Sequence, residues 1–344
     1  MRVVALEEHF TVPDLVQRID PNAISRRGFR SRKAPARGPS AVELLPEIGE
    51  RRLQSMDEAG ITMQVLSNSG PGHDLVPGPD GIGIARAMND HLAAAIARHP
   101  KRFAGFAVLP MQSADAAIAQ FVRAVRDLRF VGALINGTTE GRFLDHPSYD
   151  GLLAAAVELD VPIYVHQHLA PEPVRNAYFA DLPPGASRVL ESAGWGWHSE
   201  TAIHVLRLVL SGALDRHPRL KLIIGHMGEM LPMMLARADD VFALEIEHLQ
   251  RSISRTILDQ VWLTTSGMFT EPPFIAALLT FGIDRMMFSV DYPYSANKKG
   301  RAFLDHLSLA PADMNKFSHG NADALMLRGF WTAWTPTTEC HGAA

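Results

Sequence analysis

Short, almost wholly apolar segments recur eight times along the chain, and stretches with the spacing of amphipathic helices separate them. Consecutive apolar positions are typical of a parallel strand buried on both faces, because helices cover both sides of such a sheet. The predicted strands cover residues 3–6, 63–67, 103–109, 132–135, 162–165, 222–225, 261–265 and 286–290. Clear helical spacing covers residues 83–98, 115–128, 149–159, 199–210 and 273–281.

Eight strands that alternate with helices predict an α/β fold, the (β/α)8 or TIM barrel, formed as a single domain with inserted loops. A doubly wound open sheet is the alternative. Against it, the glycine pattern G-x-G-x-x-G does not follow the first predicted strand. The barrel domain is expected to span residues 1–335, and residues 336–344 are expected to form a disordered tail.

The composition of the 344 residues fits a globular protein better than a nucleic-acid-binding or membrane protein. Hydrophobic residues make up 47% and charged residues 20%, so a large core can form. The net charge of −4 is spread evenly, which argues against nucleic acid as a partner. Apolar runs stay short of a membrane span, and the first residues lack a signal-peptide pattern. One cysteine, Cys340, fits a reducing compartment, so a cytoplasmic protein is expected.

Two segments depart from the alternating pattern. Residues 26–38 carry six basic residues among Gly and Pro, which predicts an exposed loop or subunit contact, or a lid that attracts an anionic substrate. Residues 171–197 are rich in Pro, Gly and Trp and follow the fifth predicted strand. Loops at that end of a barrel commonly form the active site, so this segment is expected near the substrate.

Polar residues with metal-binding side chains mark the end of the first strand. Glu7 and His9 are two positions apart, so on a regular strand their side chains point the same way. Glu8 then points the other way, as expected for a structural acid. Alone, this Glu-x-His pair is a weak sign of a metal site.

Three further strands also end in polar residues. The fifth ends at His166, the sixth at His226 and the eighth at Asp291. Each histidine alone could be an ordinary core residue bonded to the backbone, but an unpaired polar group at the end of an apolar strand is costly. Strand ends meet at one rim of a barrel. Two imidazoles and two carboxylates there predict a site for one divalent ion, Zn²⁺ or Mn²⁺, formed by Glu7, His9, His166 and Asp291.

Segments spread over nearly the whole chain resemble the amidohydrolase superfamily. Within it they are most similar to the metal-dependent, non-oxidative aromatic decarboxylases, such as the γ-resorcylate, 2,3-dihydroxybenzoate and 5-carboxyvanillate decarboxylases. The resemblance is carried by ALEEHF at 5–10, RRLQSMDEAGI at 51–61, RFAGFAVLP at 102–110, FVGALINGT at 130–138, LDVPIYVH at 159–166, HPRLKLIIGHMGEMLP at 217–232, TTSG at 264–267, FSVDYPY at 288–294 and GNA at 320–322.

The resemblance implies roles for residues at matching positions. Glu7 and His9 form the Glu-x-His start of the resorcylate-type decarboxylases, and His166 and Asp291 match further metal ligands. Asp291 is also the expected acid that protonates the substrate ring. His226 matches a catalytic histidine beside the metal, and Glu229 looks like the carboxylate that orients it.

Five residues are candidates for binding the substrate. Arg52 and Arg237 match arginines that hold a substrate carboxylate in some relatives, although a surface or helix-end ion pair is the alternative for each. Asn136 ends the fourth strand and could bind substrate or form a turn. His168 departs from the pattern of the relatives and could contact substrate, support another residue or be a solvated loop histidine. Phe10 could stack on an aromatic ring, with core packing as the alternative.

The resemblance implies a carboxy-lyase that removes CO₂ from a hydroxylated benzoic acid by protonating the ring carbon. A hydrolase or hydratase of the same superfamily, which would use a metal-activated water, is the alternative. A barrel that only binds its ligand is a third possibility. The expected partner is a small aromatic carboxylic acid, with no nucleic acid and no membrane, and the relatives imply a homodimer or homotetramer.

Overall fold

A computed structural model describes residues 1–26, 39–70, 72–76 and 78–327 of the protein. The predicted tail at 336–344 and nearly all of the basic segment at 26–38 lie outside these residues. Within the described residues, no helix combines the length and the apolar character needed to cross a membrane.

Eight parallel strands follow one another in chain order. They are β1 (Val4–Phe10), β2 (Met63–Asn68), β3 (Phe103–Gly105), β4 (Ala133–Asn136), β5 (Ile163–His166), β6 (Leu222–Ile224), β7 (Val261–Thr264) and β8 (Met286–Met287). They form a sheet β1-β2-β3 and a sheet β4-β5-β6-β7-β8. Single parallel bridges, Ala107 with Ala133 and Leu6 with Ser289, join the two sheets at both edges. This is the strand order of the predicted (β/α)8 barrel.

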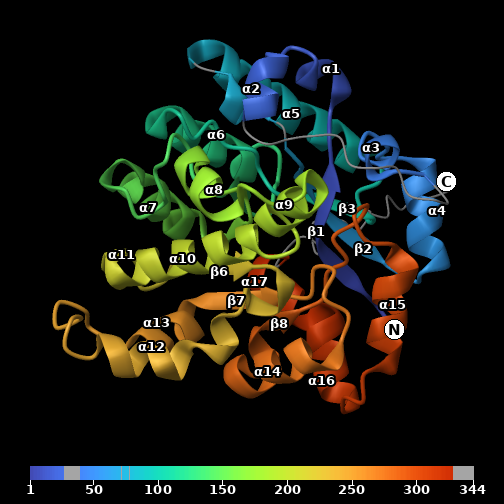
Figure 1. Ribbon diagram of the computed structural model, residues 1–344. Helices are drawn as coiled ribbons and strands as arrows, with labels where there is room; N and C mark the ends of the chain where they lie inside the picture. Colours follow the sequence, from blue (N-terminus) through green and yellow to red (C-terminus); the bar gives the residue numbers. More distant parts are fainter. Residues whose placement is uncertain (27–38, 71, 77, 328–344) are drawn as a thin grey trace, which may run out of the picture.

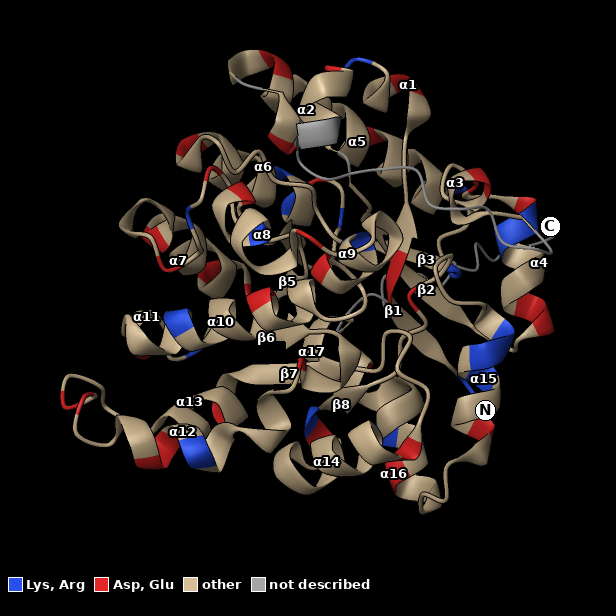
Figure 2. Ribbon diagram, viewed as in Figure 1, with Lys and Arg blue, Asp and Glu red and all other residues tan. Residues whose placement is uncertain are grey.

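Helices surround the strands on the outside (Figure 1). They are α1 (Pro13–Val16), α2 (Pro21–Arg26), α3 (Ala41–Leu44), α4 (Glu50–Glu58), α5 (Gly78–Arg98), α6 (Ala114–Arg126), α7 (Asp150–Leu159), α8 (Glu172–Phe179), α9 (Pro184–Glu191), α10 (Gly196–Leu210), α11 (Ala213–Arg216), α12 (Leu235–Phe242), α13 (Ile253–Gln260), α14 (Glu271–Phe281), α15 (Asn297–His306), α16 (Pro311–Asn315) and α17 (Asn321–Met326). Lys, Arg, Asp and Glu are interspersed over these outer helices, and acidic residues also mark β1 near the centre (Figure 2).

The barrel interior is closed at one end by α17. Side chains from β1, β2, β4, β5, β6 and β8 form a cluster with Ala322, Leu325 and Met326 of that helix. Asn321 donates hydrogen bonds to the carbonyl groups of Ile283 and Met286, where β8 begins. Because α17 covers the end where the strands start, the opposite end, where they finish, is left for a site.

The structure differs from the sequence-based boundaries in three strands, one helix and one segment predicted as a loop. The third and eighth strands, predicted at 103–109 and 286–290, are shorter, and β1 continues to Phe10. Helix α5 begins at Gly78, five residues before the prediction. The segment at 171–197, predicted as a loop, contains α8 and α9. Both helices have proline in their first turn, where a missing backbone N–H costs little, so proline there is compatible with a helix.

Candidate metal centre

The backbone at the end of β1 is irregular. Its pairing with β2 shifts register between Ala5 and Glu8, and Glu7 has φ 61°. The predicted alternation of side chains is therefore interrupted, although Glu7 and His9 do lie together. Asp291 at φ 68° is left-handed too. Such φ values cost a non-glycine residue about 1–2 kcal/mol each, a strain that often accompanies functional sites.

The four predicted metal ligands come from three separate strand ends. His166 Nε2 lies 3.2 Å from Glu7 Oε1, and His9 Nε2 lies 3.2 Å from Asp291 Oδ1. Ligand atoms of Glu7, His9 and His166 all lie within 4.8 Å of one another. Asp291 joins this group through its contact with His9.

All four of these facing atoms are buried and have no hydrogen-bond partner among the described residues. Buried polar atoms left unpaired are costly, so their convergence on one place is strong evidence for a missing partner. Two ligand atoms that each lie about 2.1 Å from one ion, with an angle of about 90° at the ion, are about 3 Å apart. This separation matches the 3.2 Å measured between His166 and Glu7 and between His9 and Asp291. The residues therefore fit a divalent metal ion.

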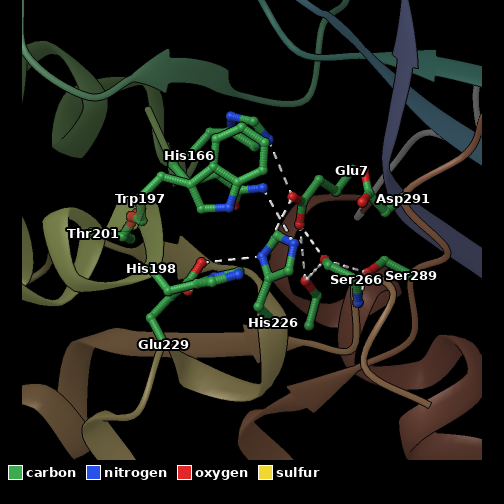
Figure 3. A network of polar contacts seen from close by, with 12 residues as sticks. Glu7, His166, Trp197, His198, Thr201, His226, Glu229, Ser266, Ser289 and Asp291 are labelled. Carbon is green, nitrogen blue, oxygen red and sulfur yellow. Dashed lines mark hydrogen bonds and ion pairs between the residues drawn. The ribbon is translucent and has the colours of Figure 1, made fainter. Parts of the chain in front are cut away.

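A ring of hydroxyl groups holds the second oxygen of Glu7. The Ser266 hydroxyl contacts Glu7 Oε2 (Figure 3). The Tyr164 hydroxyl contacts the same oxygen, and Thr264 donates to it at 3.4 Å. Burial alone would raise the pKa of Glu7, but the neighbouring rings of His226, His166 and His9 together hold that pKa below its usual range. Glu7 is thus a carboxylate with Oε1 turned to the metal site.

The second ring nitrogen of His9 is also occupied. His9 Nδ1 is 3.1 Å from the hydroxyl of Ser67 at the end of β2. A hydrogen bond at Nδ1 fixes the ring and leaves Nε2 for the metal, the usual arrangement for a ligating histidine. Arg52 supports the same residue by donating to the His9 carbonyl group.

Glu8 is a structural acid, in agreement with the sequence analysis. It is fully buried and accepts hydrogen bonds from the backbone N–H groups of Val290 at 2.7 Å and Tyr292 at 3.1 Å. Burial raises the pKa of Glu8 to about 8, although these two hydrogen bonds and the positive charge of Arg52 each lower it. Glu8 ties β1 to the segment after β8 that carries Asp291.

His226 and Glu229 lie together beside the four candidate metal ligands. His226 Nδ1 is 3.0 Å from Glu229 Oε1 and 3.8 Å from Glu7 Oε1. Burial alone would lower the pKa of His226, but the charges of Glu229 and Glu7 raise it to about 10. The other oxygen of Glu229 is 2.5 Å from Nδ1 of His198, a residue that the sequence analysis did not select.

Two of the predicted substrate-binding residues lie at the rim around the metal ligands. Asn136 ends β4 next to His166 on β5, and it lines a pocket with Asn68, Ile135 and Thr139. His168 is buried, with Nδ1 3.2 Å from the Leu169 carbonyl oxygen, and packs against Gly137 at the end of β4. Gly137 has φ 53° and leaves no room there for a Cβ atom, so a glycine is needed beside His168.

The other three predicted substrate-binding residues are placed differently. Arg52 is fully buried, and its guanidinium donates to the His9 and Glu47 carbonyl groups and to Gln64, so it supports the strand end instead of presenting a fork to substrate. Phe10 is in the hydrophobic core, stacked on His91 of α5. Arg237 is exposed on α12, outside the network of Figure 3. Motif matching located these residues in sequence but could not show which way each side chain points.

Several functional residues were missed by the sequence analysis. They are Tyr164 and Ser266, which hold Glu7; Ser67, which holds His9; and His198, which contacts Glu229. A signal existed for Tyr164, because it stands two residues before His166 on a strand and so shares its face. Ser266 stands in the quoted TTSG segment. His198 had no such signal, since α10 begins there and its partner is 31 residues away.

The chain matches a family described as amidohydrolase over residues 10–326. This covers most of the chain, so the protein belongs to the amidohydrolase family. Its relatives place it among the decarboxylases of that family, as the sequence resemblance predicted.

Decarboxylase orsB of Emericella nidulans is 36% identical over 332 residues, which cover 94% of this chain and 96% of that protein. A gamma-resorcylate decarboxylase of Rhizobium sp. (strain MTP-10005) is 37% identical over 336 residues, covering 94% and 97%. Among solved structures, a dihydroxybenzoic acid decarboxylase from Polaromonas sp. JS666 with bound manganese and the inhibitor 2-nitroresorcinol has a TM-score of 0.79 and 31% identity, covering 97% of this chain and 98% of that one.

Proposed function

We propose that the protein is a metal-dependent, non-oxidative carboxy-lyase that removes CO₂ from a hydroxylated benzoic acid. The observation that carries the proposal is the convergence of four unpaired, buried ligand atoms at the carboxyl ends of the strands. The relatives that act on dihydroxybenzoates support the substrate class. The barrel is proposed to form one domain over residues 1–335.

Glu7, His9, His166 and Asp291 would hold one divalent ion, Mn²⁺ or Zn²⁺. When bound, this ion would supply a positive charge that holds the carboxylate and an ortho-phenolate oxygen of the substrate and so fixes the ring. His166 and Asp291 have side chains that are 13% and 16% exposed, whereas Glu7 and His9 are closed off. Substrate would therefore enter from the side of His166 and Asp291.

Asp291 is the proposed acid. With Oδ1 facing His9, Oδ2 would deliver a proton to the ring carbon that bears the carboxylate. The bond from that carbon to the carboxylate then breaks, CO₂ leaves, and its electron pair restores the aromatic ring. One proton is consumed and one CO₂ is released, and solvent reprotonates the partly exposed Asp291.

His226 is proposed to donate a hydrogen bond to a substrate oxygen. The charges of Glu229 and Glu7 raise the pKa of His226, which favours a ring that donates a hydrogen bond to a phenolate or carboxylate oxygen. Glu229 would orient this ring. Asn136 and His168 are the proposed further substrate contacts, because both lie at the rim beside His166.

The proposal is tested by incubating the metal-loaded protein with a panel of 2,6-dihydroxybenzoate, 2,3-dihydroxybenzoate and 5-carboxyvanillate. Loss of ultraviolet absorbance with stoichiometric release of CO₂ is expected for at least one acid. A parallel panel of esters, lactones and amides serves as the comparison. Turnover only in this second panel would reject the carboxy-lyase and support the hydrolase.

We also propose that the protein works in the cytoplasm as a homodimer or homotetramer. The single cysteine and the resemblance to the decarboxylases support this proposal. Light scattering after gel filtration measures the mass, and a monomer at micromolar concentration would contradict the oligomer. Cell fractionation tests the compartment.

A further inference from the structure

His198 is a buried histidine that the proposed reaction does not use. It lies in the first turn of α10, and its side chain is 10% exposed. Its Nδ1 is 2.5 Å from Glu229 Oε2, and its Nε2 is 3.2 Å from the Ala193 carbonyl oxygen. Carboxylate and carbonyl oxygens only accept hydrogen bonds, so both ring nitrogens face acceptors. The shorter of the two contacts identifies His198 Nδ1–H as the donor to Glu229 Oε2.

A shared metal ion is the alternative to hydrogen bonds between these side chains. His198, His226 and Glu229 offer ligand atoms within 4.8 Å of one another. Two atoms bound to one metal at about 2.1 Å and at right angles or wider lie about 3 Å or more apart. The 2.5 Å between His198 Nδ1 and Glu229 Oε2 leaves room for a proton but not for an ion. The cluster is a chain of hydrogen bonds.

Glu229 is the middle of this chain. It is fully buried, and each of its oxygens faces one histidine: Oε2 faces His198, and Oε1 faces His226 Nδ1 at 3.0 Å. The two rings meet edge to face with centroids 4.8 Å apart. A buried carboxylate needs charge-assisted partners on both oxygens. Without His198, Oε2 would lose its partner and the carboxylate would no longer be held in place against His226.

We propose that His198 is a positioning residue for the decarboxylation, which acts by holding Glu229 in the orientation that fixes His226. This inference rests on the proposed function, since it is through His226, 3.8 Å from Glu7 Oε1, that the chain of hydrogen bonds reaches the metal ligands (Figure 3). The bond from His198 to Ala193 also ties α10 to the turn before it, so the test must separate positioning from this structural tie.

Two variants separate the two hydrogen bonds. In His198→Asn the amide nitrogen lies near the position of Nδ1 and can still donate to Glu229, whereas in His198→Gln it lies near Nε2 and can still donate to Ala193. We expect His198→Gln to lower kcat about 10- to 100-fold, the usual effect of losing an outer partner of a metal site, with KM and metal content close to wild type. His198→Asn is expected to retain more than about a third of kcat, because the bond to Glu229 remains.

The opposite ranking, with His198→Gln active and His198→Asn impaired, would show that the Ala193 tie matters and would overturn the inference. Equal kcat in both variants and wild type would overturn it as well. Thermal unfolding of each variant identifies any loss that comes from misfolding.

Nitrogen-15 NMR of histidine-labelled protein provides a readout that does not depend on turnover. For His198, a ring with its proton on Nδ1 is expected, and its signals should vanish in His198→Gln. The signals of His226 should shift in His198→Gln but stay near wild type in His198→Asn. A His198 ring with no proton on Nδ1 would reject the inference. Wild-type protein that decarboxylates none of the acids would reject the proposed function alone, leaving this result to stand.

Discussion

His9 Nε2 lies 3.2 Å from Asp291 Oδ1, although the two residues come from opposite ends of the chain. Neither atom has a hydrogen-bond partner among the described residues. The first and last strands are neighbours in the barrel, joined by the bridge between Leu6 and Ser289, and this closure brings the two ligands together. The metal centre therefore depends on the ring of strands being complete, since no single segment contains it.

Removing a ligand should separate metal binding from chemistry. His166→Ala is expected to lose most bound metal, because it removes a buried ligand from the centre of the group. Asp291→Asn is expected to retain metal at saturating Mn²⁺ but to lose turnover by at least about 100-fold, because the amide cannot deliver the proton. Metal analysis and kcat on the best substrate measure the two effects. His306→Ala and Asp127→Asn, both at exposed positions, are the matched controls. Full activity in Asp291→Asn would contradict its role as the acid.

Metal removal should cost both activity and stability. Dialysis against a chelator is expected to abolish turnover, and added Mn²⁺ or Zn²⁺ should restore it. Because the ion binds only the folded state, metal at 100 times its Kd should stabilise the protein by about 2.7 kcal/mol, which is seen as a higher unfolding midpoint. A chelated protein that keeps its activity and its unfolding midpoint would argue against a metal centre.

Tyr164→Phe should weaken metal binding without unfolding the barrel. The phenol contacts Glu7 Oε2, so its loss frees the carboxylate to rotate, and metal affinity should fall about 10- to 100-fold. Tyr149→Phe is the matched control, since it removes another buried phenol, which donates to the Met111 carbonyl group at 2.8 Å. A titration of metal into each protein compares the affinities. Equal losses of metal affinity in both variants would mean that the loss of any buried phenol hydroxyl weakens metal binding, and that the contact with Glu7 is not the cause.

Gly225→Ala is expected to disturb the same carboxylate sterically. Gly225 has φ −82°, which alanine adopts freely, but its Cβ would lie 2.5 Å from Glu7 Oε2 and 3.1 Å from the Tyr164 hydroxyl. Metal affinity should therefore fall while the backbone stays folded, as judged by circular dichroism. Gly83→Ala, where no heavy atom lies within 4 Å of the new Cβ, controls for adding a methyl group. Unchanged metal affinity in Gly225→Ala would show that Glu7 is not held at this distance.

Acid should destabilise the protein partly through His204. Burial lowers the pKa of His204 to about 4, and its Nε2 accepts a hydrogen bond from the Leu144 N–H at 2.9 Å. As the pH falls, His204 in the unfolded chain takes up a proton near its ordinary pKa of about 6.5, whereas the buried ring in the folded protein does so only near pH 4. The folded state is therefore destabilised between about pH 6.5 and pH 4, and the loss reaches about 2 kcal/mol at pH 5.

The measurement for His204 is the urea midpoint at several pH values. His204→Gln should show a shallower decline than wild type between pH 7 and pH 5, because glutamine does not titrate. His306→Gln, at an exposed position, is the control and should decline as wild type does. Parallel curves for His204→Gln and wild type would contradict a neutral, buried His204.

The strand ends show what can be predicted from the sequence. His166 and Asp291 follow apolar runs, and the rule that parallel strands end at one rim was enough to predict that they meet. The alternation of side chains along a strand predicted Glu8 as a structural acid. Arg52 could not be placed in this way. Its position matches a motif, but the motif does not reveal that its guanidinium donates to the His9 carbonyl group.

The sequence by itself predicted the eight-strand repeat and the four candidate metal ligands, because hydrophobic periodicity and strand termini are local properties of the chain. The tertiary structure alone decided that Glu7 turns inward at φ 61°, that Tyr164 and Ser266 hold it, and that His198 reaches Glu229. These outcomes depend on which polar atoms meet across the barrel. Burial requires each such atom to find a partner, and only the packed structure brings the partners together.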